Sequence, residues 1–271
     1  MKPVNFSHVF PATIADTLAG LGQEGASLVA GNQSLGPMLN LRLARPDRVI
    51  DLSSLDRLRA VEETDTHVRF GARITHAEIE DGEVPDPTGG WLRDVAGHIA
   101  YRAVRNRGTI GGSLCHADPA ADWVIVMTTL GATAIIEGAS GERRAPIEKF
   151  ITGPYATALE KGEILVAVEV RQPGPDARWG YWKFVRQTGD FAKASAAVYI
   201  DPIHGIKRCV IGALGRQPAV LDDPAGLLDG SVKPANAIAK ALPDRLASSL
   251  TMHVVALTRA LSQALSHEVV A

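Results

Sequence analysis

The segment from Arg105 to Asp122 constrains the fold and chemistry of this chain more than any other stretch. It reads Arg-Asn-Arg-Gly-Thr-Ile-Gly-Gly-Ser-Leu-Cys-His-Ala-Asp-Pro-Ala-Ala-Asp, so three glycines, at positions 108, 111 and 112, fall within five residues. Glycine has no side chain, which lets a phosphate or a ring approach the backbone where main-chain N–H groups can point at an anion. The hydroxyls of Thr109 and Ser113 add donors. We expect this segment to bind a ligand.

A second segment, residues 28–37, has the same character. An apolar strand pattern over 27–30 leads into the polar turn Gly31-Asn32-Gln33-Ser34, and a helical pattern follows over 35–43. Such a strand, turn and helix start would leave unpaired N–H groups beside Ser34, where the helix dipole favours an anion. One loop of this kind is readily explained as a helix cap. Two of them favour a dinucleotide-type ligand.

Together the two segments resemble the FAD-binding motifs in the medium subunit of molybdenum hydroxylases, a family that includes carbon monoxide dehydrogenase, quinoline oxidoreductase and bacterial xanthine dehydrogenase-like enzymes. The first motif is Ala30-Gly31-Asn32-Gln33-Ser34-Leu35 with Leu41-Arg42-Leu43, and the second is Thr109-Ile110-Gly111-Gly112-Ser113 with Asp118-Pro119-Ala120-Ala121-Asp122. A third segment, from Gly180 through Ala192, supports the match, which covers nearly the whole chain. The resemblance implies an α+β fold: the FAD-binding fold of the vanillyl-alcohol-oxidase/PCMH type with a C-terminal antiparallel-sheet domain.

The resemblance also implies which residues contact FAD. The first loop would wrap the pyrophosphate, and Asn32, which replaces a glycine of many bacterial members, is tolerant of positive φ. Asp122 would hydrogen-bond ribitol or ribose hydroxyls, and Lys183 would lie near the isoalloxazine, where a cation stabilises the anionic reduced flavin. Ser113 departs from a frequent asparagine, and His116 stands where some members have threonine. The full implied set is Leu28, Val29, Ala30, Gly31, Asn32, Gln33, Ser34, Leu35, Ile99, Ala100, Thr109, Ile110, Gly111, Gly112, Ser113, His116, Asp122, Leu165 and Lys183.

Hydrophobic patterning divides the chain into three parts. Residues 1–57 have a βαβ pattern, residues 58–172 mix strands and short helices, and residues 178–271 follow the linker Pro173-Gly174-Pro175. We expect two N-terminal FAD-binding subdomains, then a three-stranded sheet with helices. Thr75 and Glu78 form a capping-box pattern. The expected helices are 11–21, 35–43, 234–246 and 251–269, and the expected strands are 27–30, 48–51, 67–71, 132–136, 163–171, 180–187, 194–201 and 206–214.

Composition narrows the function classes. The chain has 271 residues, 46% of them apolar, and can bury a sizeable core, while its net charge of −2 gives no reason to expect nucleic acid or an anionic membrane surface. We find no apolar run of about 18 residues that would span a membrane. Residues 1–13 lack the basic and apolar regions of a secretory signal, so we expect a cytoplasmic protein. Cys115 and Cys209 are too few for an iron–sulfur cluster or a structural zinc site, so we predict no metal site on this chain.

Several other motifs have ordinary explanations. Residues 20–25 satisfy G-x-G-x-x-G, but a helical pattern precedes them and a strand pattern follows, the reverse of a Rossmann site, so we interpret them as a helix stop and turn. Cys115-His116 lacks the spacing of a zinc site, and we interpret Cys115 as a packed thiol. The sequence has no G-x-S-x-G or H-E-x-x-H motif, and we assign no catalytic acid or base. Arg105 and Arg107 are equally compatible with phosphate binding and with solvated loop charges.

The resemblance implies a role in a larger complex. A large partner subunit would carry the molybdopterin cofactor and hydroxylate the substrate, and a small partner would carry two [2Fe–2S] clusters. FAD on this chain would accept the electrons and deliver them to an external acceptor, and the complex would be a dimer of heterotrimers. Two alternatives are a self-contained FAD-dependent reductase or oxidase of the same fold, and a scaffold that has lost its flavin. The substrate pocket would lie on another chain, so this sequence does not identify the substrate.

Overall fold

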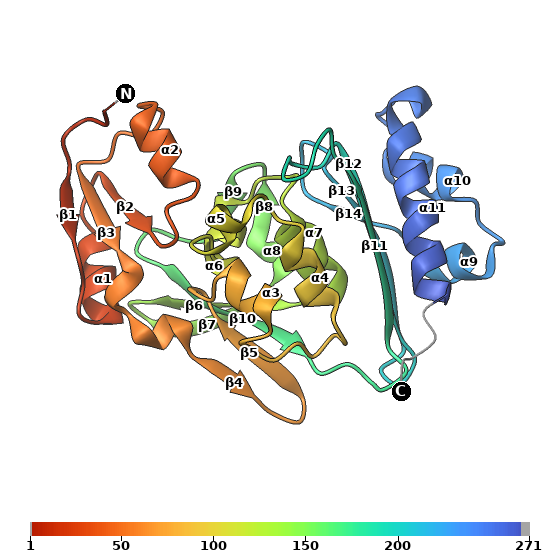
Figure 1. Ribbon diagram of the computed structural model, residues 1–271, viewed down its shortest axis with the longest axis horizontal. Coiled ribbons are helices and arrows are strands. Elements are labelled where there is room, and N and C mark those ends of the chain that lie inside the picture. The colour runs from red at the N-terminus through yellow and green to blue at the C-terminus, as the bar shows by residue number, and fades with distance from the viewer. Residues whose placement is uncertain (1, 267–271) are drawn as a thin grey trace.

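Three larger β-sheets follow one another along the long axis of the molecule, and a two-stranded sheet lies within residues 151–157 (Figure 1). The computed structural model describes residues 2–266. Sheet one lies in residues 7–51, sheet two in 61–171 and sheet three in 178–220. The three ranges follow the expected division of the chain, and the domain boundaries at 57 and 172 are kept as a proposal.

The first sheet is parallel, with strand order β1-β3-β2. Helix α1 begins at Ile14 rather than at residue 11, because Thr13 caps it and forms a capping box with Asp16. Helix α2 ends at Asn40 rather than at residue 43, and Arg42 beyond it is left-handed with φ 59°. The elements are β1 (Ser7–Val9), α1 (Ile14–Leu21), β2 (Ala26–Val29), α2 (Leu35–Asn40), β3 (Arg48–Asp51), η1 (Leu52–Ser54) and η2 (Asp56–Arg59).

The G-x-G-x-x-G stretch at residues 20–25 is a helix stop and turn, as predicted. Helix α1 ends at Leu21, Gly22 caps it, and Gly25 is left-handed with φ 73° just before β2. A Cβ on Gly25 would lie 2.3 Å from a carboxylate oxygen of Asp47. The motif therefore serves the turn between a helix and a strand.

The second sheet is antiparallel, with order β4-β5-β10-β6-β7, and short helices pack against it. Thr75 and Glu78 form the predicted capping box at the start of α3. The elements are β4 (Val61–Glu63), β5 (His67–Gly71), α3 (His76–Asp81), α4 (Trp91–Gly97), α5 (Arg102–Arg105), α6 (Ile110–His116), α7 (Asp122–Leu130), β6 (Thr133–Gly138), β7 (Gly141–Pro146), α8 (Ile147–Phe150), β8 (Ile151–Gly153), β9 (Ala156–Thr157) and β10 (Ile164–Arg171).

The third sheet has four antiparallel strands, one more than predicted. Helix α10 ends at Ala241, just before Leu242 and Pro243, rather than at residue 246. The predicted end of the last helix, residues 267–269, lies outside the described residues. The elements are β11 (Arg178–Phe184), β12 (Ala194–Asp201), β13 (Ile206–Gly212), β14 (Ala219–Val220), α9 (Pro224–Asp229), α10 (Pro234–Ala241), η3 (Ala247–Leu250) and α11 (Thr251–Ser266).

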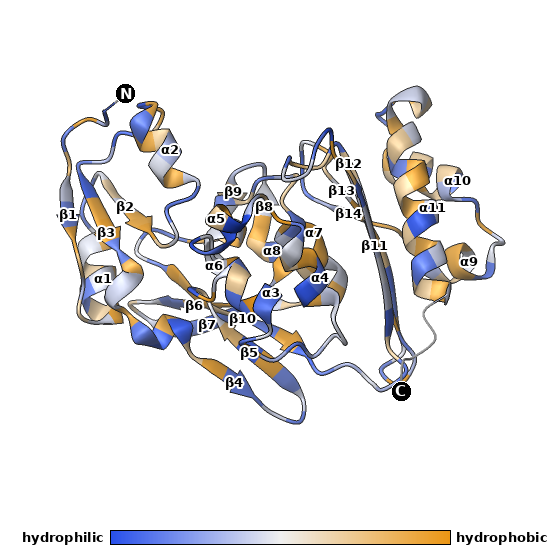
Figure 2. Cartoon of the chain, viewed as in Figure 1, coloured by the Kyte–Doolittle hydropathy of each residue, from blue (hydrophilic) through white to orange (hydrophobic). Residues whose placement is uncertain are grey.

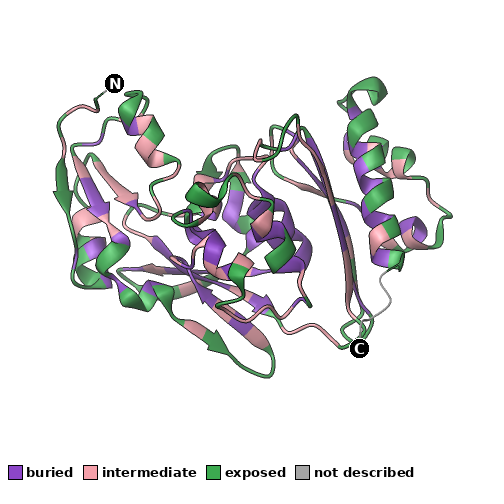
Figure 3. Ribbon diagram, in the orientation of Figure 1, coloured by how far each residue is buried: buried purple, intermediate pink, exposed green. Residues whose placement is uncertain are grey.

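Helix α7 joins the second and third sheets. All of its residues are buried, and it packs against β10 on one side and β12 and β13 on the other. Helix α11 covers the opposite face of the third sheet, so β12 between them is buried along its whole length (Figure 3). The buried residues of α7, β12 and α11 are mostly apolar (Figure 2). Trp91 of α4 stacks on Trp179 of β11, with ring centroids 5.5 Å apart. This continuous packing fixes β11 relative to the second sheet.

Within residues 2–266, no helix combines the length and the apolar character needed to cross a membrane.

Candidate functional site

The first loop, residues 28–35, presents a row of open backbone donors. The amides of residues 32–36 have no hydrogen-bond acceptor among the described residues. Asn32 is left-handed with φ 61°, the conformation its tolerance of positive φ allows. Ser34 precedes α2, but its hydroxyl makes no capping hydrogen bond. Val29 is buried in a core cluster, so only its backbone is free to face a ligand. The loop thus offers several N–H groups and one hydroxyl to an anion.

In the second loop, residues 108–113, every amide except that of Thr109 already has a hydrogen-bond acceptor within the described chain. The amide of Ile110 donates to the carbonyl of Ile74 at 2.9 Å, and that of Gly111 donates to the carbonyl of Ala72 at 3.0 Å. The amides of Gly112 and Ser113 donate to the hydroxyl and the carbonyl of Thr109, both at 3.0 Å. The expectation that these N–H groups point at an anion is therefore wrong. The Ser113 hydroxyl makes no hydrogen bond within the described chain and is still available.

The glycines of the second loop serve mainly to pack protein against protein. A Cβ on Gly111 would lie 2.5 Å from the Ala72 Cβ, and one on Gly108 would lie 2.8 Å from the His76 ring. A Cβ on Gly112, which is solvent exposed, would meet only the Thr109 hydroxyl, at 2.7 Å. Neither these three residues nor Gly31 has a positive φ. Gly112 alone is placed to leave room for a ligand.

The two loops touch each other at Gly31. A Cβ at this position would lie 1.9 Å from the carbonyl oxygen of Arg107, so only glycine permits the contact. The Arg107 side chain also reaches across, and its Nε donates to the carbonyl of Gly31 at 3.4 Å. The strand–turn–helix of the first subdomain is therefore held directly against the glycine-rich turn of the second.

Asp122 and Lys183, which lie 61 residues apart in sequence, meet in a buried ion pair. Asp122 is the first residue of α7, and its Oδ1 accepts hydrogen bonds from Lys183 Nζ at 2.7 Å and from Tyr181 Oη at 2.6 Å. Its Oδ2 has no partner among the described residues. The Lys183 side chain is only 12% exposed. The arrangement leaves one carboxylate oxygen free to accept a hydroxyl hydrogen bond.

Tyr181 is a site residue that the sequence analysis missed. Burial and the charge of Asp122 raise the pKa of its phenol well above the ordinary value, so it stays protonated and donates. The signal was present: Tyr181 and Lys183 are two residues apart on β11 and share one face of the strand.

The backbone at residues 98–100 is held from two sides. Lys183 Nζ donates to the carbonyl of His98 at 3.0 Å. Arg105 Nη1 donates to the carbonyls of Ile99 and Ala100 at 3.0 and 3.2 Å. Ala100 is left-handed with φ 45°, a strained conformation for alanine. The two cations therefore fix the segment that contains Ile99 and Ala100, two of the residues predicted to contact FAD.

The structure separates the two arginines whose roles the sequence left open. Arg105 is paired with Glu80 through Nε and Nη2, at 2.7 and 2.9 Å, and its side chain is 12% exposed. Arg105 is therefore a structural residue. Arg107 is exposed and has no ion pair within residues 2–266, so it is still available to an anion.

The remaining predicted residues lie at the far end of α6 and on β10. The ring of His116 lies 5.2 Å from that of Tyr155, whose hydroxyl donates to Asp118 Oδ2 at 3.1 Å. Cys115 is solvent exposed, so its interpretation as a packed thiol is wrong. Desolvation by the surrounding protein nevertheless raises the pKa of its thiol to about 12. Leu165 of β10 is buried in the main core.

These groups fit a large, doubly charged nucleotide cofactor better than a metal ion. The first loop offers backbone N–H donors that have no acceptor, and Asp122 Oδ2 offers an acceptor that has no donor. Lys183 offers a cation close to the segment 98–100. Within residues 2–266, no group of three or more His, Cys, Asp or Glu side chains is placed to hold a metal ion. A pyrophosphate with attached hydroxyls is the ligand that uses both kinds of open group.

Comparisons with known proteins agree with this chemistry. Residues 4–173 match the family described as "FAD binding domain in molybdopterin dehydrogenase". The chain is 35% identical to the nicotine 6-hydroxylase medium subunit of Paenarthrobacter nicotinovorans, over 85% of this chain and 82% of that protein. It is 36% identical to the carbon monoxide dehydrogenase medium chain of Hydrogenophaga pseudoflava, over 73% of this chain and 70% of that one.

Solved structures give the same result. A chain of the Hydrogenophaga pseudoflava carbon monoxide dehydrogenase that lacks the Mo-pyranopterin moiety superposes with a TM-score of 0.86 and 29% identity, covering 97% of this chain and 98% of that chain. A chain of quinoline 2-oxidoreductase from Pseudomonas putida 86 superposes with a TM-score of 0.83 and 29% identity, covering 98% of each. The expected fold is confirmed.

Proposed function

Because this chain belongs to the family of FAD-binding domains of molybdopterin dehydrogenases, we propose that it transfers electrons between the other subunits of its complex and an external acceptor. The chain is an FAD-binding medium subunit of the molybdenum hydroxylase type, and thus an oxidoreductase subunit. Its proposed partners are a large subunit with the molybdopterin cofactor and a small subunit with two [2Fe–2S] clusters, arranged as a dimer of heterotrimers. A cytoplasmic location stays a prediction.

The row of unpartnered amides in the first loop is the observation that carries the proposed cofactor site. An FAD pyrophosphate carries two negative charges and needs several donors, which residues 32–36 supply without losing any internal hydrogen bond. The second loop contributes the Ser113 hydroxyl and the exposed surface of Gly112 rather than its amides. We propose that the cofactor's phosphates lie mainly against the first loop.

Asp122 and Lys183 would position the flavin end. FAD, when bound, supplies the ability to accept two electrons and release them to another molecule. Asp122 Oδ2 is free to accept a hydrogen bond from a ribityl or ribose hydroxyl, while its Oδ1 holds Tyr181 and Lys183. Lys183 is anchored to Asp122 and the His98 carbonyl, so its positive charge is largely balanced locally. Ile99, Ala100, His116 and Leu165 are kept as proposed neighbours of the cofactor.

The first test is release of the flavin. We expect the purified chain or its complex to be yellow and to hold one FAD per chain without a covalent bond. Acid precipitation should leave the chromophore in the supernatant, where its absorbance gives the stoichiometry. Flavin that stays in the pellet would contradict the non-covalent assignment. If added FAD changed neither the spectrum nor the melting temperature of a colourless preparation, the cofactor assignment itself would fail.

The second test concerns the ion pair. We expect Lys183→Met to cost about 3–5 kcal/mol of unfolding free energy, because it leaves the Asp122 carboxylate buried with one partner. The uncompensated negative charge should also lower the flavin reduction potential, by about 30 mV for each 1.4 kcal/mol. Urea unfolding and spectroelectrochemistry measure the two effects. The double variant Asp122→Asn/Lys183→Met should recover most of both losses, and a double variant no better than Lys183→Met would show that Lys183 does not act through Asp122.

A further inference from the structure

We propose that Arg73 and Arg107 form an anion site, a pocket that binds a phosphate group where the two loops meet. The pocket has a volume of about 200 Å³. The first sheet and its loops contribute Gly31 and Ser53 to its wall, and the second subdomain contributes Thr109 and the arginines Arg59, Arg73 and Arg107. Within the described part of the chain, no carboxylate lines this pocket. We call it the arginine pocket.

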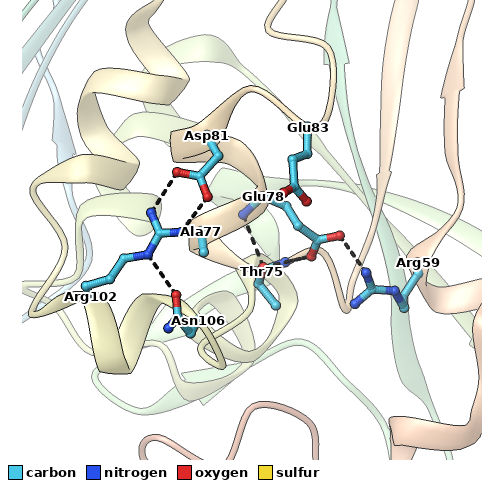
Figure 4. A pocket seen from close by; sticks show the side chains of 8 residues that line it. All are labelled: Arg59, Thr75, Ala77, Glu78, Asp81, Glu83, Arg102 and Asn106. Carbon is cyan, nitrogen blue, oxygen red and sulfur yellow. Dashed lines mark hydrogen bonds and ion pairs between the residues drawn. The ribbon is translucent and has the colours of Figure 1, made fainter.

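In a neighbouring pocket of about 280 Å³, the arginine charges are balanced by carboxylates (Figure 4). There Arg59 Nη2 pairs with Glu78 Oε1 at 2.6 Å, and Arg102 forms a two-point ion pair with Asp81. Arg102 Nε also donates to Asn106 Oδ1 at 2.8 Å. Every arginine of this neighbouring pocket therefore has a carboxylate partner. The arginine pocket shares Arg59 with it but adds two arginines of a different kind.

Arg73 and Arg107 have no ion pair among residues 2–266 and hydrogen-bond only to backbone carbonyls. Arg73 Nη1 donates to Leu55 O at 3.2 Å, and Arg107 Nε donates to Gly31 O at 3.4 Å. Burial, followed by the charge of Arg59, lowers the pKa of Arg73, and the opposing charges of Asp51, Asp56 and Glu78 do not offset this. An uncompensated positive charge in a partly buried pocket is stabilised by a bound anion.

A phosphate group is the anion that suits this pocket. The guanidinium fork matches phosphate oxygens in a two-point geometry. A volume of about 200 Å³ exceeds the roughly 30 Å³ of one water molecule several times, so a phosphate fits with part of the molecule that carries it. The hydroxyl of Ser53 is a further donor on the wall. Two sources share this chemistry: the pyrophosphate of the chain's own FAD, and a separate phosphate-bearing ligand.

The test titrates flavin-free full-length chain with inorganic pyrophosphate by calorimetry at low salt. We expect saturable binding that weakens as salt rises. Arg73→Gln/Arg107→Gln should weaken it at least tenfold. The matched control is Arg57→Gln/Arg69→Gln, which also removes two positive charges but from surface pairs with Glu137 and Glu142. Equal weakening in both double variants, or no binding at all, would overturn the proposal.

Two additions make the result decisive. Arg107→Gln alone keeps the partly buried Arg73 in place, and a loss of at least threefold there supports the pocket even if the double variant folds poorly. Repeating the titration on FAD-loaded chain distinguishes the sources: binding that persists points to a separate ligand, and binding that is excluded points to the cofactor's own phosphates. The inference rests on the arginines rather than on the flavin assignment, so a chain that binds pyrophosphate but not FAD would refute only the proposed function.

Discussion

The two glycine-containing loops are alike in sequence and opposite in structure. In the first loop, the amides of residues 32–36 lack acceptors, while in the second loop the amides of residues 110–113 are all bound to protein carbonyls or to the Thr109 hydroxyl. The helix that follows the first loop has no side-chain cap, and the helix that follows the second loop is capped by Thr109. One loop is left open for a ligand, and the other is closed to support it.

The difference shows that a glycine-rich motif can have two causes. Gly31 and Gly111 are needed because another part of the backbone or a neighbouring Cβ lies too close for any side chain. Gly112 faces solvent and is the position where a side chain would meet a ligand first. Sequence alone gives the same letter for both reasons. Only the position of the opposing atoms separates them, and substitutions can test that separation.

Among substitutions in the two loops, the largest effect should come from Gly111→Val. A Cβ there would lie 2.5 Å from Ala72 Cβ and 2.6 Å from the Ala72 carbonyl oxygen, so the second loop must move away from Ala72, the residue that follows β5. We expect a loss of about 3 kcal/mol or more in unfolding free energy, the upper end for overpacking of a core. Chemical denaturation measures it, and poor folding is the expected result.

Gly112→Val is the matched control in the same loop. Its Cβ would meet only the Thr109 hydroxyl, so the fold should lose about 1 kcal/mol while FAD binding falls sharply. Stability and flavin content of both variants should be measured side by side. If Gly111→Val kept its stability, or if Gly112→Val kept normal flavin content, the division between supporting and ligand-facing glycines would be wrong.

The next prediction concerns His76, whose protonation at low pH should destabilise the second loop but not the first. The amide of His76 donates to Gly108 O, and its Nδ1 accepts from Trp123 Nε1 at 3.0 Å. Burial, and then the charge of Arg105, lower the pKa of His76 from 6.5 to about 4. Below pH 6.5, His76 is therefore protonated in the unfolded chain but stays neutral in the folded chain. The free energy of unfolding falls between pH 6.5 and 4, by about 3 kcal/mol in total.

Hydrogen exchange gives this prediction a local readout. After correction for intrinsic rates, protection of residues 110–113 should fall between pH 6.5 and 4, while residues 32–36 should exchange fast throughout. His76→Asn can still accept from Trp123, and it should flatten this part of the stability profile while lowering stability at neutral pH. A variant with the same pH slope as the original chain would exclude His76 as the responsible group.

Much of the fold was predictable, and the failures have physical reasons. Strands β3, β5 and β12 have the predicted bounds, because each is an apolar or alternating run between clear turn residues. Helix α7 was missed because it is buried on all sides between two sheets and shows no amphipathic period. Strand β14 and helices α5 and α8 are too short to leave a pattern.

The site was predictable in its residues but not in its electrostatics. The family resemblance pointed to Asp122 and Lys183, and the structure places them 2.7 Å apart. The resemblance did not indicate that Tyr181 donates to the same oxygen of Asp122 as Lys183 does. Nor could it show that the second loop's amides are occupied, because two of the acceptors, the carbonyls of Ala72 and Ile74, lie more than 30 residues earlier in the chain. Hydrogen bonds between distant segments leave no local pattern.

The smallest effect, and the sharpest contrast, should come from the two hydroxyls at the helix starts. The Thr109 hydroxyl caps α6 by accepting a hydrogen bond from the Gly112 amide. Thr109→Ala removes this cap and should cost about 1 kcal/mol of unfolding free energy. Ser34→Ala removes a hydroxyl that caps nothing in α2, so stability should change by less than about 0.5 kcal/mol. FAD affinity should respond in the opposite order: Ser34→Ala should weaken it several-fold, and Thr109→Ala much less. Urea unfolding of the flavin-free chain and fluorescence titration with FAD provide the four values. If the two variants lost stability and affinity in parallel, the open first loop and the closed second loop would not have the separate roles that their hydrogen bonds indicate.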